Sequence, residues 1–485
     1  MGQWYQISLR LPNGNLVTIK DSLKIWNFSI RQLAKTMHMS ISKGDIDYNA
    51  FRHKGYEPTP EEWDYIDRDV RIACRAMDFM MKQGYTKLTA GANALFDYKM
   101  IVGKNFEYYF PHLDDDIDEF IRHSYRGGWC YANPLFQERE IGEGITLDVN
   151  SLYPSRMYYE DLPYGTPLYY TGRYKENEKY PLYVQHVFID LTLKKDHLPT
   201  FQLKKSLRFG STEYIKSTHG EPAEAWLTSV DLELIKEHYD IHSIEYIDGY
   251  KFKASKELFR KYVDKWMDIK EQATLDGDIP RRNQAKLFMN SLYGKFAKRP
   301  VGRSKYPYIG EDDRLHLELG EEEDRGSLYI PVGTFITAYA RAYTIRSAQK
   351  NYDRFLYADT DSLHLIGTEI PAELEVHETH LGAWKHESTF LRAYYIGAKC
   401  YCEEEIVSRE TLEKFSSENP TLVNLIDWGR VTLLKITAAG LPEKAKSEVT
   451  FDNFRVGLTV SNKLLPKHVP GGVVLKETTF QILKR

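Results

Sequence analysis

The sequence predicts an α+β protein built from more than one folding unit. Its 485 residues are too many for one compact core. Several segments carry apolar residues at helical spacing, whereas the block between residues 154 and 251 contains short strands and turns rich in Tyr, Pro and Gly. Both kinds of element are therefore expected, with at least one independent insertion in that block.

The first predicted helix covers residues 59–84. The run Thr59–Glu62 is a capping box with proline at the first helical position, apolar residues follow at helical spacing, and Gly84 ends the run. Tyr65 and Asp69 are four residues apart and so share one face of this helix. From the residues alone, that face fits the solvated side of an amphipathic surface helix.

Further elements follow in chain order. Residues 125–128 form a turn whose glycines let the backbone approach a ligand, and residues 144–149 are typical of a buried strand. The others are an alternating strand at 181–193, two antiparallel helices at 255–275 and 281–298, a hairpin at 299–325, a helix at 334–351, a strand at 354–358, and a turn between apolar strands at 469–474.

Composition narrows the class of protein. The net charge is only −4, but residues 281–305 contain eight Lys or Arg and no acid, and local basic patches decide where phosphate binds. The four cysteines form no CxxC pattern, which disfavours a zinc site or a disulfide framework. No window resembles a membrane span and the first residues lack a leader pattern, so a cytoplasmic protein is expected.

Carboxylates occur at the ends of two predicted strands. Asp148 follows an apolar strand, and Asp359 and Asp361 lie in the turn of a predicted hairpin, two residues apart, so that both point the same way in an extended stretch. A surface turn of this kind also arises by chance. Burying like charges requires a cation, however, and Mg²⁺ binds few carboxylates together with substrate phosphate. The segments therefore predict oxygen ligands for two magnesium ions.

A second pattern lies on the helix predicted at 281–298. Five residues follow one stripe of it at steps of four, four, three and four: Arg282, Lys286, Asn290, Tyr293 and Ala297. Basic side chains can pair with phosphate oxygens, an amide offers donors and an acceptor, and a tyrosine ring matches a base in size. A solvated basic face is the alternative. Lys399 and Tyr401, two apart on one predicted strand face, are a weaker signal for gripping a nucleic-acid backbone.

At this point the segments resemble a known family. DVNSLYP (148–154), KLFMNSLYGKF (286–296) and YADTDS (357–362) are similar to the three polymerase motifs of family B DNA polymerases, most closely the protein-primed, phi29-like phage branch. The runs YRGG, KCY, HESTF, VDLELIKEHYD and VPGGVV also resemble that branch, so the resemblance covers essentially the whole chain. It implies a right-hand fold of palm, fingers and thumb.

The resemblance also implies a division of the chain. A partial, RNase H-like 3′–5′ exonuclease domain is expected at the N-terminus, and two insertions typical of protein-primed enzymes interrupt the rest. The expected parts are exonuclease 1–88, palm 89–159, terminal-protein docking insertion 160–257, fingers 258–297, strand-displacement hairpin 298–330, palm 331–438 and thumb 439–485.

Roles for individual residues follow from the matching motifs. Catalysis is expected of Asp148, Asp359 and Asp361, with Asp148, Asp361 and the Val149 carbonyl as metal ligands and Asp359 supporting them. Tyr153 would lie under the incoming sugar and reject a 2′-hydroxyl, and Lys286 would hold the triphosphate. The residues expected to bind nucleotide are Ser151, Leu152, Tyr153, Lys270, Arg282, Lys286, Asn290 and Tyr293.

DNA contacts are implied in the same way. Lys399 and Tyr401 would position the primer terminus, and the 125–128 turn would bind template. The residues expected to contact DNA are Tyr125, Gly127, Gly128, Gly294, Thr360, Lys399 and Tyr401.

The implied function is that of a DNA-templated DNA polymerase. It would add dNTPs to a 3′-hydroxyl, or to a terminal-protein hydroxyl, with two Mg²⁺ ions for which Mn²⁺ can substitute. The expected partners are a DNA primer-template, dNTPs and a terminal protein that serves as primer, without a membrane. A monomer in the host cytoplasm, encoded by a phage or mobile element, is expected.

The chain departs from the family pattern at its front. Family members begin with an exonuclease domain whose acids lie in three motifs, and only the third, the remnant Tyr65 and Asp69, is recognised. The first two would lie upstream of Met1. Because a two-metal nuclease cannot run on one of its four carboxylates, we predict that this chain does not proofread.

A second departure lies at the thumb entrance, Ala438–Gly440, which lacks the expected preceding lysine; Lys435 and Lys444 are the candidates to replace it. Two alternative functions also stay open. A non-catalytic DNA-binding remnant is one, although the intact polymerase acids argue against it. A polymerase that copies or makes RNA is the other, and Tyr153 with the NSLYG helix argues against that.

Overall fold

The computed structural model describes residues 6–26, 28–47, 50, 52–53, 55–203, 214–311, 315–408, 423–427, 430–469 and 472–483. By its internal contacts the chain divides into two compact units. The first unit comprises residues 1–112, 255–302 and 323–333, and the second comprises 113–254, 303–322 and 334–485. The sevenfold division expected above stays a prediction.

The first unit is mainly helical, and its longest helix begins where the sequence supplies a cap. α3 (Pro60–Lys82) follows the predicted capping box: the Thr59 N–H donates to Glu62 Oε2 at 3.0 Å, and the Glu62 N–H donates to Thr59 Oγ1 at 3.3 Å. This predicted helix is confirmed. The unit also contains β1 (Gln6–Arg10), β2 (Leu16–Lys20), α1 (Leu23–Trp26), α2 (Ile30–Thr36), α4 (Ala90–Val102), η1 (Gly103–Asn105) and α5 (Phe106–Tyr109).

Two further helices of this unit, α9 (Arg260–Leu275) and α10 (Ile279–Phe296), pack through aromatic rings. Asp278 Oδ1 accepts the Arg281 N–H at 3.0 Å and caps α10. Phe288 of α10 lies 4.8 Å, between ring centres, from Trp266 of α9. The predicted pair of helices is confirmed, but α9 begins at Arg260 instead of residue 255, because strand β9 continues to Ser255.

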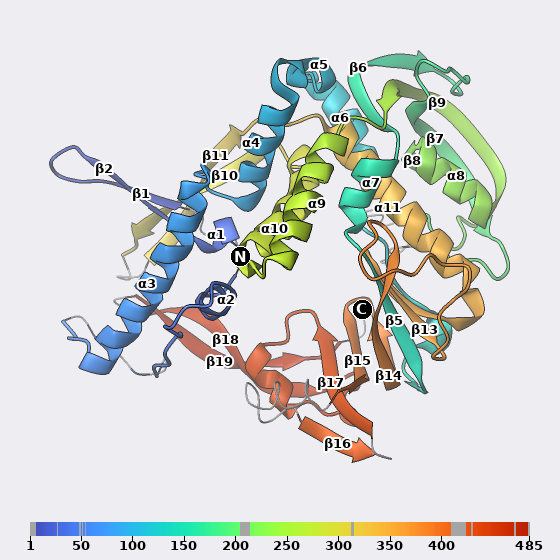
Figure 1. Cartoon of the computed structure of the whole chain (residues 1–485). Coiled ribbons are helices and arrows are strands. Elements are labelled where there is room, and N and C mark those ends of the chain that lie inside the picture. The colour runs from blue at the N-terminus through green and yellow to red at the C-terminus, as the bar shows by residue number, and fades with distance from the viewer. Residues whose placement is uncertain are drawn as a thin grey trace. The chain divides into compact units, whose positions relative to one another are not determined.

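The second unit is organised around a large sheet. Its strand order is β16-β17-β15-β14-β5-β13-β12-β3, and β4 pairs with β14; β5, β13, β14 and β15 lie side by side in Figure 1. The strands are β3 (Cys130–Ala132), β4 (Glu140–Ile141), β5 (Gly144–Val149), β12 (Phe355–Asp359), β13 (Ser362–Ile366), β14 (Trp384–Gly397), β15 (Cys400–Val407), β16 (Val423–Asp427) and β17 (Arg430–Ala438).

Helices and turns of the second unit connect these strands. α6 (Asp115–Ser124) precedes β3, α7 (Leu152–Tyr159) follows β5 directly, and α11 (Ile330–Lys350) precedes β12. The short 3₁₀ turns are η2 (Pro134–Phe136), η3 (Tyr352–Arg354) and η4 (Glu443–Glu448). The helix predicted at 334–351 is confirmed, although it begins earlier, at Ile330.

A separate four-stranded sheet occupies the stretch predicted to hold an insertion. Its order is β6-β9-β7-β8, from β6 (Leu162–Thr171), β7 (Leu182–Leu193), β8 (Ala223–Thr228) and β9 (Tyr239–Ser255), and α8 (Ser229–His238) packs on it. The alternating strand predicted at 181–193 is confirmed as β7. Its buried positions alternate at Leu182 and Val184 and again from Gln185 to Leu191, so the alternation changes phase once, between Val184 and Gln185.

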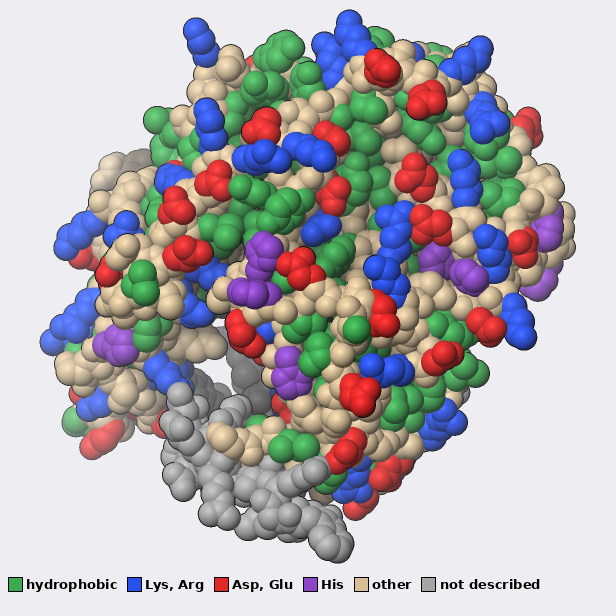
Figure 2. All heavy atoms as spheres, turned by 45° about the vertical axis from the view of Figure 1, so that its right-hand side comes forward, with side chains coloured by type: hydrophobic (Ala, Val, Ile, Leu, Met, Phe, Trp, Pro, Cys, Tyr) green, Lys and Arg blue, Asp and Glu red, His purple; other side chains and the backbone are tan. Residues whose placement is uncertain are grey.

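Two hairpins complete the described chain. β10 (Val301–Ile309) pairs with β11 (Leu315–Asp324), as predicted for 299–325, and β18 (Thr459–Val469) pairs with β19 (Gly472–Gln481). The turn predicted at 469–474 includes residues 470–471, which lie outside the described residues. Within the described chain, no helix is both long and apolar enough to cross a membrane. Figure 2 shows acidic and basic side chains interspersed over one face.

Strand β5 lies at the centre of the core and carries the first acid of the site. Five of its six residues are buried, as predicted for an apolar strand covered on both faces. Ile145 and Leu147 pack with Trp129 and Trp384 in one cluster in which all four side chains are fully buried. Asp148 alone in β5 is partly exposed, so the core fixes the backbone from which its carboxylate projects.

Candidate active site

The backbone positions of three acidic residues are neighbours where strands of the central sheet end. In the register of the central sheet, Ser362 of β13 is the cross-strand partner of both Asp148 in β5 and Asp359 in β12. The Val149 N–H donates to the Asp361 carbonyl at 2.8 Å and so ties the end of β5 to the turn between β12 and β13. The predicted position of the Asp148 strand beside the acidic hairpin is confirmed.

The acidic turn, residues 359–362, is the tight hairpin turn that was predicted. Thr360 has a φ of 62°, in the left-handed region, and the Asp361 N–H donates to the Asp359 carbonyl at 2.7 Å. The chain reverses within this turn, so Asp359 and Asp361 do not share an extended stretch, and the direction of their carboxylates stays a prediction. A β-branched residue in the left-handed region costs about 1–3 kcal/mol, so surrounding contacts must hold it.

Two contacts hold Thr360 in this conformation. Its N–H donates to the Trp129 carbonyl at 2.7 Å, and its carbonyl accepts the Thr344 hydroxyl at 2.7 Å. Trp129 is fully buried in the core and Thr344 is buried on α11, so both partners are rigid. The turn therefore holds its acids in place before any ligand binds.

The two glycines of the 125–128 loop have different surroundings. A Cβ on Gly128 would lie 2.4 Å from Thr360 Oγ1, whereas nothing lies within 4 Å of a Cβ on Gly127. Glycine at 128 lets the loop pass directly against the acidic turn. The predicted close approach of backbone is thus present at Gly128, where the partner is the protein itself, and Gly127 is exposed.

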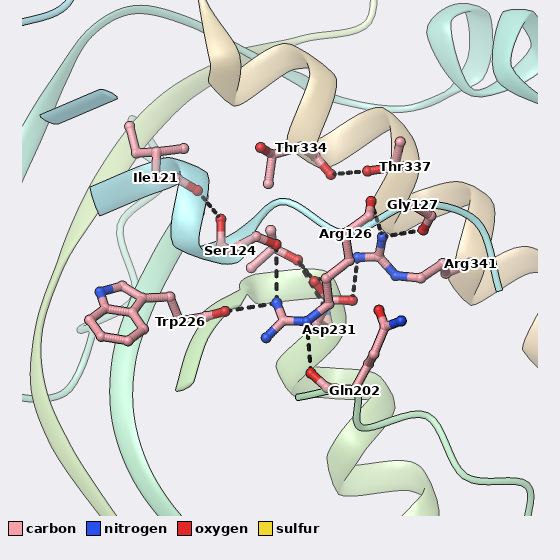
Figure 3. A network of polar contacts seen from close by, with 11 residues as sticks. Ile121, Ser124, Arg126, Gly127, Gln202, Trp226, Asp231, Thr334, Thr337 and Arg341 are labelled. Carbon is pink, nitrogen blue, oxygen red and sulfur yellow. Dashed lines mark hydrogen bonds and ion pairs between the residues drawn. The ribbon is translucent and has the colours of Figure 1, made fainter. Parts of the chain in front are cut away.

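A buried guanidinium holds this loop from α11 (Figure 3). Arg341 Nη1 donates to the carbonyls of Arg126 and Gly127, at 2.8 and 2.9 Å. Arg341 Nη2 donates to both carboxylate oxygens of Asp231 on α8, at 2.7 and 2.9 Å. The loop backbone, α11 and α8 are therefore joined by one side chain.

Arg126 completes the network from within the loop. Its guanidinium donates to the carbonyls of Ser124 at 3.1 Å, Trp226 at 2.9 Å and Gln202 at 3.1 Å. Burial lowers the pKa of Arg126 to about 10, although the charge of Asp231 opposes that change. Arg126, Arg341 and Asp231 do not belong to the predicted site.

Lys399 reaches the acidic turn from the hairpin between β14 and β15. Its Nζ lies 2.5 Å from Asp359 Oδ2, and its N–H donates to the Tyr357 hydroxyl at 3.0 Å. Burial would lower the pKa of Lys399, but its hydrogen bond to Asp359 and the charges of Asp359 and Asp361 outweigh that effect and raise it. A cation is therefore held beside the acids.

The predicted strand face shared by Lys399 and Tyr401 is wrong. Lys399 has a φ of 56° and lies in the turn before β15, not in the strand. The Tyr401 ring is 8% exposed and packs against Tyr357, with 4.9 Å between ring centres, and against His364 at 5.2 Å. Tyr401 therefore packs in the core behind the acidic turn, while the Lys399 side chain remains accessible to solvent.

The segment after β5 turns sharply into α7. Ser151 has a φ of 55° and stands at the start of the helix, and the Asn150 N–H donates to the Ala383 carbonyl at 3.0 Å. Tyr153 is half-buried and packs against the core of the sheet. The Leu152 side chain is 1% exposed, so only its backbone could contact a nucleotide.

The basic stripe of the first unit lies on α10 as predicted. Arg282, Lys286, Asn290 and Gly294 are exposed and Tyr293 is half-buried. The opposite face is buried through Gln284, Ala285, Phe288, Met289, Leu292 and Phe296. Lys270 is half-buried on α9. The polar face of α10 is thus presented by a rigid aromatic core.

The exonuclease remnant lies on α3. Tyr65 and Asp69 are both half-buried, and Asp69 Oδ1 is buried without a hydrogen-bond partner among the described residues. The Lys43 ammonium lies 5.6 Å from the centre of the Tyr65 ring. Over the whole described part of the chain, no group of three or more His, Cys, Asp or Glu is arranged to hold a metal ion.

The thumb-entrance lysine has one described candidate. Lys435 Nζ pairs with Glu405 Oε1 at 2.8 Å, and burial, which would lower its pKa, is outweighed by that carboxylate, so the pKa is raised. The Ala439 N–H donates to the Lys399 carbonyl at 3.1 Å. The Lys444 side chain lies outside the described residues. Lys435 is thus a structural cation on the central sheet.

Comparison with known proteins agrees with this geometry. A family model described as DNA polymerase type B, organellar and viral, matches residues 49–379. The DNA polymerase of Bacillus phage phi29 is 45% identical over 489 aligned residues, which cover 99% of this chain and 83% of that protein. The DNA polymerase of Streptococcus phage Cp-1 is 35% identical, over 99% of this chain and 82% of that protein.

A solved structure has the same fold. Phi29 DNA polymerase complexed with primer-template DNA and incoming nucleotide substrates matches with a TM-score of 0.91 and 43% identity, over 99% of this chain and 83% of that one. The predicted α+β polymerase fold is confirmed. The chain belongs to the type B DNA polymerases of organelles and viruses, and it is a phi29-like, DNA-directed DNA polymerase.

Proposed function

We propose that this polymerase extends a primer at the acidic turn, with Asp148 and Asp361 as its principal metal ligands and Asp359 supporting them. The observation that carries the proposal is the convergence of the three acids across β5, β13 and β12, in a turn held rigid from two sides. The reaction is attack of a 3′-hydroxyl on the α-phosphate of a dNTP, with release of pyrophosphate.

Divalent metal dependence is general in this family, and we propose that this chain holds two magnesium ions. Carboxylate and carbonyl oxygens are the ligands that Mg²⁺ prefers, and Asp148, Asp361 and the Val149 carbonyl would supply them. Asp359 is already paired with Lys399, which suits it to a supporting role. When bound, the metal acts as a Lewis acid on the attacking hydroxyl and the leaving phosphates, and Mn²⁺ can substitute.

The chain's own side chains would bind and orient the nucleotide. Lys286 and Arg282 lie on one exposed stripe that suits a triphosphate, with Lys270 as a further cation. Asn290 and Tyr293 extend that stripe toward a base. Ser151, Leu152 and Tyr153 follow the Asp148 strand, where the half-buried Tyr153 ring would exclude a 2′-hydroxyl.

DNA would be held around the acidic turn. Lys399 would contact the primer terminus, with Thr360 beside it and Tyr401 acting from below. The exposed Gly127, with Tyr125 and Gly128, would line the template path, and Gly294 would do so on α10. Primer-template DNA is the ligand named in the matching phi29 complex.

Protein-primed initiation is the finer part of the proposal. A terminal protein would dock on the insertion at 160–257 and present a hydroxyl in place of the sugar hydroxyl. The protein would act as a monomer in the host cytoplasm, as expected of a phage or mobile-element replicase; the similar polymerases are encoded by phages. The absence of proofreading stays a prediction, which a mismatched 3′ end tests.

Primer extension tests the polymerase proposal. With magnesium and dNTPs, Asp361→Ala should lose several orders of magnitude in rate while still binding DNA in a gel-shift assay, because it loses a metal ligand and not a DNA contact. Asp353→Asn, an exposed acid outside the site, is the matched control. Full activity in Asp361→Ala would refute the assignment, and no extension by a folded, DNA-binding parent would favour the non-catalytic remnant.

A mismatched 3′ end tests the proofreading proposal in the same assay. We expect that the parent chain leaves the mismatch in place. Trimming that persists in Asp69→Ala would show a contaminating nuclease, and trimming that is lost in Asp69→Ala would show that this chain proofreads.

A further inference from the structure

A buried acid–base pair lies below the acidic turn. His364 Nδ1 and Glu403 Oε1 are 2.6 Å apart, and the two side chains are 1% and 0% exposed. The Tyr395 hydroxyl also donates to Glu403 Oε1, at 2.7 Å. Neither His364 nor Glu403 belongs to the motifs that carry the family resemblance, and the proposed reaction does not use them.

The pair bridges strands that share no backbone ladder. His364 is on β13 and Glu403 on β15, and in the sheet these strands are separated by β14 and β5. Three strand spacings of about 4.8 Å amount to roughly 14 Å in a flat sheet, yet the two side chains touch. β14 has a register shift between Phe390 and Arg392, where its pairing changes from β5 to β15, so the sheet bends there. The contact between His364 and Glu403 closes that bend.

Stability alone does not account for the pair. Burial removes the carboxylate from water, and apolar side chains of similar volume often replace buried polar pairs without loss. His364 Nε2 and Glu403 Oε2 are also buried without a hydrogen-bond partner among the described residues. Burial raises the pKa of Glu403, but the charge and hydrogen bond of His364 outweigh burial and hold it below its ordinary value. The carboxylate is therefore charged, and the contact is directional.

Aromatic rings connect the pair to the site. The His364 ring packs edge-on against Tyr357 and Tyr401, at 5.1 and 5.2 Å between ring centres. The Tyr357 hydroxyl accepts the Lys399 N–H at 3.0 Å and lies 3.5 Å from Asp359 Oδ2. Displacing His364 would shift Tyr357, and with it the turn that places Lys399 against Asp359.

We propose that His364 and Glu403 are positioning residues for the primer terminus: the hydrogen bond between them fixes the β14–β15 hairpin, with Lys399, against the acidic turn. The inference rests on the proposed function, because it takes Lys399 as the primer contact. The ligand concerned is the 3′-terminal nucleotide of the primer. The incoming dNTP, whose proposed triphosphate contacts lie on α10, should be affected much less.

Steady-state primer extension separates the two substrates. Glu403→Gln keeps the size of the side chain and removes its charge, and we expect the KM for primer-template to rise about tenfold while the KM for dNTP changes less than twofold. The matched control is Glu404→Gln. Glu404 is the next residue of β15, and its carboxylate pairs with Arg392 at 2.8 and 2.9 Å instead of with His364.

A double substitution distinguishes positioning from simple packing. His364→Leu combined with Glu403→Leu should give a melting temperature at or above that of the parent, while the KM for primer-template stays raised. If the double leucine variant instead has the parent's KM for primer-template, His364 and Glu403 only fill space and the inference fails. If the double variant does not fold, Glu403→Gln decides alone: an unchanged primer KM in that folded variant overturns the proposal. A parent that extends no primer overturns the proposed function, and this inference with it.

Discussion

Alanine at position 128 would place a methyl group against the acidic turn. The added Cβ would lie 2.4 Å from Thr360 Oγ1, 2.7 Å from Cγ2 and 2.9 Å from Cβ. Carbon atoms in contact are normally about 3.5–4.0 Å apart. Rotation of the Thr360 side chain cannot remove the third contact, because Cβ does not move with χ1. Either the 125–128 loop or the acidic turn must therefore shift by about 1 Å.

The expected loss of rate and stability in Gly128→Ala depends on the contacts that hold the 125–128 loop and the acidic turn. Arg341 holds the loop through two carbonyls, and the Trp129 carbonyl and the Thr344 hydroxyl hold Thr360. Overpacking of this kind costs about 1–3 kcal/mol of stability. Misplacing reacting groups by about 1 Å costs about 10²-fold in rate. Gly128→Ala should thus lose about 100-fold in rate and remain folded.

The assay is single-turnover nucleotide addition at saturating DNA and dNTP, with urea unfolding measured on the same samples. Gly142→Ala is the matched control, because Gly142 is exposed and nothing lies within 4 Å of its added Cβ. Gly127→Ala separates DNA affinity from chemistry, since its Cβ also meets nothing. A folded Gly128→Ala enzyme whose rate is within twofold of the parent would refute the reasoning.

Three further predictions concern other parts of the chain. Lys286→Ala should raise the KM for dNTP by about 10–100-fold in steady-state extension with a smaller change in kcat, because a triphosphate contact is lost, whereas Arg281→Ala, exposed on the same helix but off the stripe, should not. Asp231→Ala should cost about 3–5 kcal/mol in urea unfolding, because it leaves the buried Arg341 and Arg126 uncompensated; a loss below about 1 kcal/mol would contradict the buried ion pair. Burial lowers the pKa of His238 to about 4, so between that value and its unfolded pKa of about 6.5 the unfolded chain binds the extra proton. The free energy of unfolding should therefore fall by about 2 kcal/mol from pH 7 to pH 5 through this residue, and His238→Gln should remove that part of the slope.

Local chemistry explains which elements could be predicted from the sequence. The capping box at Thr59 and the caps and spacing of α10 act over three or four residues, so α3 and the basic stripe are where they were predicted. Strand β5 was predictable because Ile145, Leu147 and Val149 alternate along six residues, a length typical of a strand. The motif acids lie at the ends of such strands, which is why their meeting could be predicted as well.

Tertiary contacts account for what could not be predicted. The left-handed φ of Lys399 places it outside the strand assumed for it, and that of Thr360 reverses the chain between Asp359 and Asp361. Tyr401 is buried because Tyr357 and His364 arrive beside it from other strands. No local signal marks Arg341, which bonds to Gly127 at a separation of 214 residues. Asp231 lies inside the run VDLELIKEHYD, but nothing in that run indicates that Asp231 pairs with Arg341.

Helix α11 links the two elements that shape the site. Arg341 and Thr344 are three residues apart and so project from one face of the helix. Arg341 bonds to the 125–128 loop and Thr344 bonds to the acidic turn, and Gly128 lets loop and turn pack directly on each other. A displacement of α11 would therefore move the proposed template contact and the proposed metal ligands together. Asp231 extends the same connection to α8, so the sheet of the insertion is joined to the acidic turn through buried groups only.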